Sequence, residues 1–264
     1  MSIQLFLWPI VFIQRTKRTM KKLVFLCLAL TAALFATAQT AKKPTKDWSK
    51  FDFTNRAADH LVIQYGADAW TGRPSAVRTG NGLSRHFNVY FMFDKPVKSN
   101  PKYSVAFGAG LGTSHIFFDN TRVDFKSGAP TLQFTAVDSV DHFQKNKATS
   151  IYAEIPAEIR YYSNPENPNK SWKAAIGVKV GSLLKAYTKG KNLVNKQGET
   201  VYGTSYIEKN VTKRYINGTM LAVTGRVGYG SLSLHAAYQF NGVLKQGFGP
   251  SMQRLSLGIT LSGL

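Results

Sequence analysis

The sequence predicts an all-β protein, an eight-stranded antiparallel transmembrane β-barrel of up-and-down meander topology preceded by a cleaved signal peptide. Three observations carry this prediction. Apolar and polar residues alternate with a period of two in eight segments, each about as long as the roughly 9 to 11 residues that a tilted strand needs to cross a membrane. The connections between the segments alternate between long and short, as in barrels with short periplasmic turns and longer outer loops. An export signal precedes them all.

Residues 1–38 have the features of a secretory signal peptide. A cationic start at Met20-Lys21-Lys22 precedes an apolar run from Leu23 to Phe35, and Ala36-Thr37-Ala38 provides a small-x-small cleavage pattern. The run is too short for a spanning helix of about 20 residues. We therefore expect cleavage before Gln39. The residues before Met20 are either an extended n-region or a mis-assigned start, and we favour Met20 as the true start.

Charge and cysteine content narrow the function classes. The chain has 34 Lys and Arg against 14 Asp and Glu, a net charge of +20. Loss of the signal peptide with its five cations would leave 29 basic and 14 acidic residues, a net charge of +15. Such a charge suits nucleic acid or an anionic membrane surface, but no nucleic-acid recognition motif accompanies it. The single cysteine, Cys27, lies in the signal peptide, so the mature chain would have no disulfide and no thiolate site.

The mature chain divides into a polar periplasmic leader, residues 39–58, and the barrel, residues 59–264. Because the strand number is even, both termini are expected in the periplasm. The longest connections are expected at residues 113–149 and 188–212. The eight predicted strands are Leu61–Ala67, Phe87–Phe93, Tyr103–Leu111, Ile151–Tyr161, Trp172–Val180, Leu221–Val227, Leu232–Phe240 and Leu255–Leu261.

The alternation also predicts which way the side chains point. In lipid every backbone N–H and C=O needs a partner within the protein, so a sheet crosses a membrane only as a closed barrel. Apolar side chains then face acyl chains and polar side chains face the lumen. Aromatic residues near the strand ends are expected to form girdles at the membrane surfaces. These residues are Trp70, Tyr103, Tyr161, Tyr162, Trp172, Tyr187 and Phe240.

The inner faces of the fourth and fifth predicted strands carry charged residues. These are Glu154, Glu158, Arg160, Lys173 and Lys179. An eight-stranded barrel has room only for its own side chains, so the charges need partners among themselves. The sequence therefore predicts a Glu–Lys/Arg network that fills the lumen and is structural rather than conductive.

A second group of basic residues lies around the third outer loop. It contains Lys189, Lys191, Lys196, Lys209, Lys213 and Arg214. On the outer surface the nearest anions are lipopolysaccharide phosphates, with which lysine and arginine pair well. The sequence predicts lipopolysaccharide contacts for Lys189, Lys191, Lys196, Lys209 and Arg214. The simpler alternative is a solvated charged loop.

No segment predicts catalysis or cofactor binding. The glycine-rich stretch Gly108 to Gly112 is followed by neither a helix nor a Lys-Ser/Thr pair, so it is not a phosphate loop, and its glycines are expected to relieve crowding in the lumen. Asp138, Asp141 and His142 offer a carboxylate and a histidine for hydrolysis, but a solvated loop is by far the better explanation. No histidine pair has metal-ligand spacing. We predict no catalytic residue, no cofactor and no metal.

Four stretches of the sequence resemble one known family. They are Asn55–Leu61, the Gly-rich strand Val105–Gly112, Lys145-Asn146-Lys147, and Tyr152–Tyr161 with its internal Ile-Pro pair. Together they resemble the PorT-like outer-membrane β-barrel proteins of Gram-negative bacteria. The resemblance spans the mature chain and implies the barrel architecture and the outer-membrane location. It implies no catalytic residues.

These observations predict a non-enzymatic outer-membrane protein with a structural, surface-interaction or secretion-support role. Its expected partners are outer-membrane lipid and the barrel-insertion machinery, although the chain ends in Ser262-Gly263-Leu264 rather than in the aromatic residue common among such barrels. The alternatives are an outer-membrane enzyme of lipase or acyltransferase type, a small porin with an open lumen, and a soluble lipocalin-like barrel with its apolar faces inward.

Overall fold

The computed structural model describes residues 60–75, 77–80, 84–119, 121–136 and 141–263. The predicted signal peptide and leader, residues 1–58, lie outside these ranges. None of the described residues belongs to a helix long and apolar enough to cross a membrane. Apart from one 3-10 turn, η4 (Pro168–Lys170), the described elements are strands. They are β1 (Leu61–Thr71), β2 (Arg85–Pro96), β3 (Tyr103–Phe118), β4 (Thr121–Asp124), β5 (Gln133–Ala136), β6 (His142–Tyr162), β7 (Trp172–Val194), β8 (Ile207–Val211), β9 (Thr219–Tyr229), β10 (Leu232–Gln239) and β11 (Gln253–Ser262).

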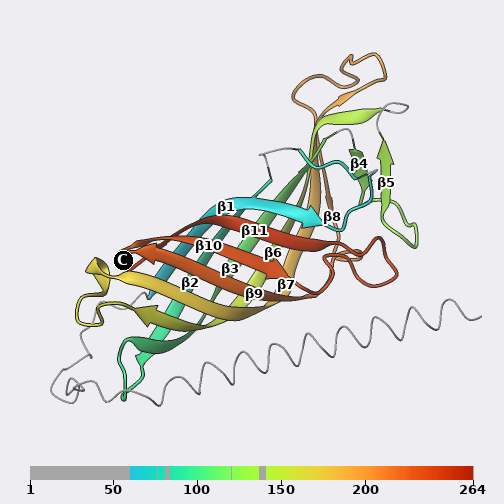
Figure 1. The fold of residues 1–264 in the computed structure, drawn as a ribbon. Coiled ribbons are helices and arrows are strands. Elements are labelled where there is room, and N and C mark those ends of the chain that lie inside the picture. Colours follow the sequence, from blue (N-terminus) through green and yellow to red (C-terminus); the bar gives the residue numbers. More distant parts are fainter. Residues whose placement is uncertain (1–59, 76, 81–83, 120, 137–140, 264) are drawn as a thin grey trace, which may run out of the picture. The chain divides into compact units, whose positions relative to one another are not determined.

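Eight of these strands close a ring in the order β1-β2-β3-β6-β7-β9-β10-β11 (Figure 1). Every neighbouring pair is antiparallel, and β11 returns to β1 from Val62 opposite Ser262 to Thr71 opposite Gln253. Each ring strand follows its neighbour in the chain, so the barrel is an up-and-down meander. The predicted barrel and all eight predicted strands are confirmed, and the cleaved signal peptide stays a prediction.

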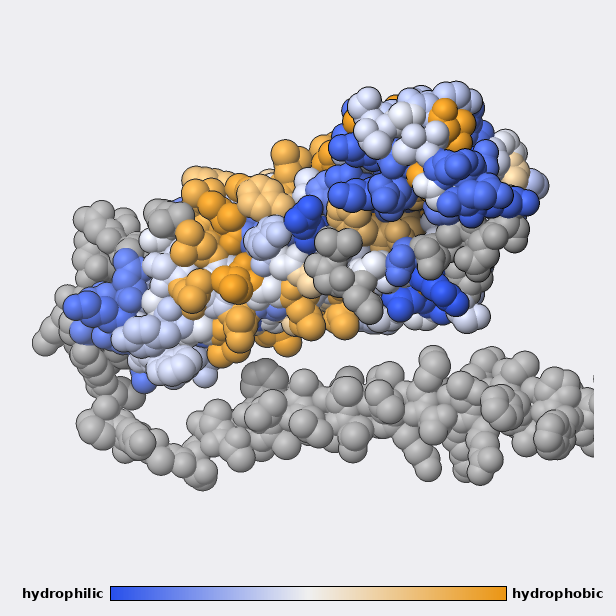
Figure 2. Space-filling model, turned by 90° about the horizontal axis from the view of Figure 1, so that it is seen from above, coloured by the Kyte–Doolittle hydropathy of each residue, from blue (hydrophilic) through white to orange (hydrophobic). Residues whose placement is uncertain are grey.

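Most large apolar side chains of the ring lie on its outside. Ile155 and Ile176 are 63% and 69% exposed, whereas Glu154 and Arg160 on the inner face are 2% and 1% exposed. Figure 2 shows the hydrophobic residues gathered along the middle of the barrel, with hydrophilic residues at both ends. Such a surface is stable only against acyl chains, because water would be in contact with most of the apolar area. The soluble lipocalin-like alternative is therefore wrong.

Three ring strands run well past their predicted ends. β3 continues to Phe118, β6 begins at His142 and β7 continues to Val194, where β8 pairs with it. The connections expected at residues 113–149 and 188–212 are thus partly strand. The register of β6 against β7 shifts at Ile151/Tyr152, which marks the passage out of the barrel. We call residues 142–150 of β6, residues 186–194 of β7 and β8 the extension sheet.

The barrel mouth at the long-loop end is closed by a hydrophobic core that the sequence did not predict. Residues of the β4–β5 hairpin, such as Phe125 and Leu132, meet residues of the later connections, such as Tyr215 and Leu244, over Trp70 at the end of β1. All of them are buried. The loops therefore seal the outer mouth by ordinary apolar packing.

The aromatic girdle forms at the short-turn end. Tyr103 contacts Tyr161 with ring centroids 5.4 Å apart, and Trp172 contacts Tyr229 at 5.7 Å, all on the outer surface. The prediction is wrong for two residues, because Trp70 and Tyr162 are buried inside the ring. Tyr161 and Tyr162 are consecutive in one strand, so they must point to opposite faces.

Candidate functional site

The lumen holds a first ion-pair cluster around Glu154. The Lys179 Nζ atom lies 3.0 Å from the Glu154 Oε2 atom, and the Tyr90 hydroxyl donates a 2.5 Å hydrogen bond to the same oxygen. Lys179 Nζ also donates to the Tyr90 hydroxyl at 3.2 Å. All three residues are buried, so this carboxylate is balanced by a cation and a hydroxyl inside the barrel.

A second cluster surrounds Glu158. Its Oε2 atom accepts a 2.9 Å hydrogen bond from Arg160 Nε and a 3.1 Å hydrogen bond from Arg226 Nη2. Arg160 also lies 3.7 Å from the carboxylate of Asp94, which in turn accepts a 2.5 Å hydrogen bond from the Ser104 hydroxyl. The network thus reaches four strands of the ring, β2, β3, β6 and β9.

The fifth predicted lumen residue, Lys173, is also buried. Its ammonium group lies 5.7 Å from the ring centroid of Tyr162. All five predicted residues therefore face the barrel interior. The sequence missed their partners Tyr90, Asp94 and Arg226, because strand register decides which inward residues meet.

A third polar group in the lumen is a chain of hydrogen bonds through two histidines. His86 Nδ1 lies 2.8 Å from Asp68 Oδ1, and His86 Nε2 lies 2.8 Å from His235 Nε2. His235 Nδ1 lies 2.9 Å from the Thr260 hydroxyl, which accepts a hydrogen bond from Gln64. One assignment satisfies every contact: His86 donates to Asp68, His235 donates to His86, and Thr260 donates to His235. In this assignment every hydrogen bond of the series points from Thr260 toward Asp68, and both histidines are satisfied without a further partner.

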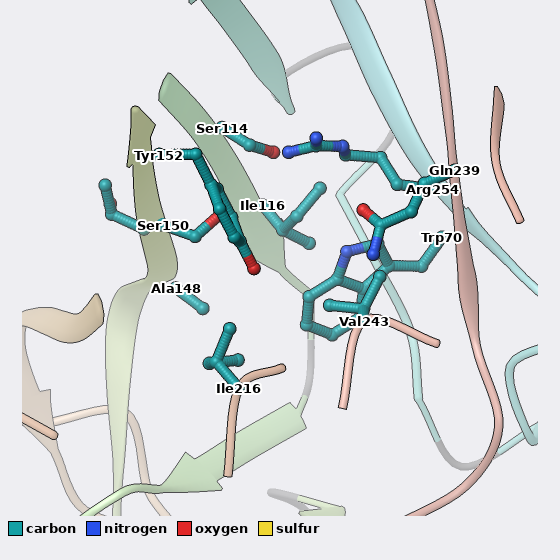
Figure 3. Close-up of a pocket in the computed structure, with 11 residues that line it drawn as sticks. Trp70, Ser114, Ile116, Ala148, Ser150, Tyr152, Ile216, Gln239, Val243 and Arg254 are labelled. Atoms are coloured by element: carbon teal, nitrogen blue, oxygen red, sulfur yellow. The ribbon is translucent and has the colours of Figure 1, made fainter. Parts of the chain in front are cut away.

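The voids beside these groups are small. One, of about 10 Å³, lies near the outer mouth between Trp70, Tyr152, Gln239 and Arg254 (Figure 3). Another of about 10 Å³ is lined by His235 and its neighbours deeper in the barrel. Each has room for about one water molecule. These two voids therefore offer no space for a substrate.

The most unusual surface of the described structure is a set of lysines on the extension sheet. In one row of the sheet Lys147 of β6 lies opposite Lys189 of β7, which lies opposite Lys209 of β8. In the next row Lys145 lies opposite Lys191. Three of these side chains are exposed and two are half-buried, whereas the intervening residues of β6 and β7 are buried on the other side of the sheet. We call these five residues the lysine face.

Like charges directly opposite each other destabilise a sheet. Among the residues that the structure describes, none of the five lysines forms an ion pair. Two of them contact aromatic rings instead, Lys209 at 4.4 Å from the Tyr187 centroid and Lys147 at 5.4 Å from that of Phe117. A third cation, Arg85, lies 5.6 Å from the same Phe117 ring. The lysine face is thus an uncompensated cationic surface.

The lysine face contains three of the five predicted lipopolysaccharide contacts, Lys189, Lys191 and Lys209. Lys196 lies in the turn after β7 and Arg214 in the segment after β8, so neither belongs to its two rows. The two lysines that the sequence reasoning missed come from Lys145-Asn146-Lys147. Their i, i+2 spacing places both on one face of a strand, but the sequence predicts a long connection at this position.

Catalytic and metal-binding groups were not predicted. Of the residues offered for the enzyme alternative, Asp138 lies outside the described residues, and Asp141 and His142 lie at the start of β6. His115 of β3 lies with its Nδ1 atom 2.9 Å from the Thr149 hydroxyl. Within the described ranges no group of three or more His, Cys, Asp or Glu residues is arranged to hold a metal ion.

The eight antiparallel strands form a closed ring that is apolar outside and polar inside. Short turns lie at one end of the ring and long connections at the other. These features define an integral outer-membrane β-barrel protein. The chain belongs to the outer membrane protein beta-barrel domain family, whose model matches residues 63–252, more than half of the sequence. Its location is the outer membrane.

Solved structures similar to this chain include two of Ail, the attachment invasion locus protein of Yersinia pestis. Each is 12% identical in sequence and covers 76% of this chain and 94% of the Ail chain, with TM-scores of 0.31 and 0.30. One of the two is a complex with the heparin analogue sucrose octasulfate. At this level the similarity carries no information on the ligands of this chain. No curated protein matches the sequence.

Proposed function

We propose that this chain is a non-enzymatic surface protein of the outer membrane that binds the phosphate groups of lipopolysaccharide through its lysine face. The observation that carries the proposal is the cross-strand stacking of Lys147, Lys189 and Lys209 beside Lys145 and Lys191 without an ion pair in the described structure. Such a surface is less stable alone than with an anion bound, and phosphate oxygens accept hydrogen bonds from several ammonium groups at once.

The position of the lysine face supports a lipid phosphate as its anion. On the outer surface of β7 the exposed Leu184 and Lys185 are followed by Tyr187 and then by Lys189 and Lys191. Tyr187 and Lys189 are two residues apart, about 7 Å along a strand. Cations therefore lie on both sides of the last aromatic residue, where the acyl chains end and the headgroups begin.

The lumen supports a role without transport or catalysis. Glu154, Glu158 and Asp68 are all engaged in the interior, and the two voids described there are water-sized. A small porin of this class would show discrete conductance in a planar bilayer, and we expect none. The stretches resembling PorT-like proteins, including the Ile155-Pro156 pair in β6, support placing the chain in that group of the family.

The direct test compares the folded barrel with a variant in which all five lysines of the lysine face are replaced by Gln. Flotation would measure binding to vesicles that contain lipid A with both phosphates or its dephosphorylated form. One lysine near an anionic membrane surface contributes about 1 kcal/mol, so loss of five should weaken binding by more than about 100-fold at low salt. The wild-type protein should bind the phosphorylated vesicles far better and should lose affinity as salt rises.

A matched control replaces Lys95, Lys98 and Lys102 by Gln at the short-turn end, where the predicted topology places the periplasm. This variant should bind the phosphorylated vesicles like the wild type. Equal binding by the five-lysine variant, or equal binding of the wild type to vesicles with and without phosphate, would refute the proposal.

A further inference from the structure

The opposite side of the extension sheet borders a hollow of about 260 Å³. Its floor is formed by two ladder rows of β6, β7 and β8, one with Asn146, Gly190 and Glu208 and the other with Thr188 and Asn210. Residues of β4 and the turn that follows it complete the wall. The hollow is smaller than the roughly 300 to 1,000 Å³ of pockets for drug-sized ligands, so it suits one small unit.

Two polar side chains of this hollow have no partner in the described structure. Asn146 is 6% exposed and Thr188 is 4% exposed, and neither side chain forms a hydrogen bond there. Their polar atoms are not fully enclosed by protein, so they are accessible from the hollow. The amide of Asn146 and the hydroxyl of Thr188 therefore present free donors and acceptors to whatever fills the hollow.

Other polar groups around the hollow are held in fixed orientations. Asn210 Nδ2 donates a 2.9 Å hydrogen bond to Glu208 Oε1. Asp124 Oδ1 accepts hydrogen bonds from the backbone N–H groups of Lys126 and Ser127 at 2.8 and 3.0 Å. In each carboxylate the second oxygen remains available. The hollow is thus lined by oriented acceptors as well as by the free groups of its floor.

An aromatic ring forms part of the wall. Phe143 lies so close over Gly190 that a Cβ atom there would be 2.3 Å from the ring, so only glycine permits this packing. On another side Tyr206 stacks with Phe143 at a centroid distance of 6.4 Å and an angle of 12°. Phe143 is therefore held rigidly, as an apolar surface for a ligand that is otherwise hydrogen-bonded.

We propose that this hollow binds one unit of a neutral polyhydroxylated ligand, that is, a sugar residue. Sugar hydroxyl groups both donate and accept hydrogen bonds, so they can pair with the free amide, the free hydroxyl and the oriented carboxylates. The C–H face of a sugar ring can pack on Phe143. The cations Arg122 and Lys126 are matched by Asp124 and Glu208, so the hollow does not select an anion. It differs in this from the lysine face, and the inference goes beyond the function proposed above.

The test uses the full chain folded in detergent micelles and four probes, the methyl glycosides of glucose, galactose, mannose and N-acetylglucosamine. Nuclear magnetic resonance would follow the side-chain amide signals of Asn146 and Asn210 during titration. We expect saturable shifts with at least one probe. The variant Asn146→Leu/Thr188→Val keeps the side-chain volumes but removes the free polar groups, and it should bind at least about tenfold more weakly.

The control variant Lys145→Gln/Lys191→Gln lies on the other face of the same sheet and should bind the glycoside like the wild type. This control weakens the lysine face but leaves the hollow unchanged. Glycoside binding by this variant would therefore be independent of the lysine face, so this inference and the lipopolysaccharide proposal can fail separately. The inference is overturned if none of the four glycosides shifts the two amide signals. It is also overturned if Asn146→Leu/Thr188→Val binds as well as the wild type, or if inorganic phosphate alone produces the shifts.

Discussion

Strands β6 and β7 carry two groups of charged residues, one inside the barrel and one on the extension sheet. Inside, Glu154 lies opposite Gly181 and next to Lys179, and acid and base are paired at 3.0 Å. On the extension sheet of the same two strands, lysine lies opposite lysine, and none of these lysines forms an ion pair in the described structure. The same strand pair thus has ion pairs where its charges are buried and clustered cations without ion pairs where they are exposed.

The difference follows from the surroundings of each group. An unpaired charge in the closed lumen would be desolvated, so each one there needs a counter-charge within the protein. On the extension sheet water and ions screen the charges, so an unpaired cluster is tolerated at a modest loss of stability. Paired charges therefore serve the fold, and the unpaired ones are free to serve a ligand.

The largest expected effect comes from breaking the buried pair. Glu154→Gln leaves the ammonium group of Lys179 without its carboxylate, which should destabilise the barrel by about 3–5 kcal/mol. Urea unfolding of the detergent-solubilised protein, followed by the gel shift between folded and heat-denatured forms, would measure this loss. The double variant Glu154→Gln/Lys179→Met removes both charges and should recover most of the stability. Unchanged stability of Glu154→Gln alone would contradict a structural lumen network.

A smaller effect is expected on the lipid-facing surface between the two groups. Ile155 points outward from β6 and is 63% exposed, so Ile155→Arg places a charge among acyl chains and should destabilise the folded barrel in bilayers by about 2–4 kcal/mol. The control Lys191→Ile makes the reverse change on the extension sheet and should alter stability by less than about 0.5 kcal/mol. Equal effects of the two substitutions would show that β6 and β7 are not divided between lipid and water as described.

Packing around the lumen group can be tested at Gly112. A Cβ atom at this position would lie 2.1 Å from Glu154 Oε1, and Glu154 is held by Lys179 and Tyr90. Gly112→Ala should therefore destabilise the barrel by about 1–3 kcal/mol in the same unfolding experiment. Gly218→Ala, where a Cβ atom would meet nothing within 4 Å, should have little effect. If both variants unfolded alike, the crowding at Gly112 would not be real.

The barrel could be predicted because alternation reports burial directly. In each ring strand one face meets lipid and the other meets the lumen, so apolar and polar residues alternate, as in Phe87, Phe91 and Phe93 against their inward neighbours. The extension sheet gives no such signal because polar residues lie on both of its faces. All three residues of Lys145-Asn146-Lys147 are polar, so the sequence predicts a loop there although Asn146 is buried.

The contacts of the lumen could not be predicted, because they depend on strand register. His86 and His235 are 149 residues apart, and they meet only because β2, β1, β11 and β10 are neighbours in one register. Their inward direction follows from alternation, but their partnership does not.

The effect of Pro156 on strand pairing also depends on register. The β3–β6 ladder omits Gly108 and Ala109, which lie opposite Pro156 and Ile155 in the continuing register. The missing N–H of proline accounts for the gap.

The smallest expected effect tests the unpaired group itself. In a neutral detergent without lipopolysaccharide, Lys189→Gln removes repulsion from both Lys147 and Lys209 and should stabilise the barrel by about 0.2–1 kcal/mol at low salt. The gain should shrink as salt is added, because salt screens the same repulsion in the wild type. Lys196→Gln, in the turn after β7 and outside the lysine rows, should change neither stability nor salt response. A loss of stability in Lys189→Gln would mean that this lysine has a stabilising partner, and the contrast between paired and unpaired charge on β6 and β7 would then be wrong.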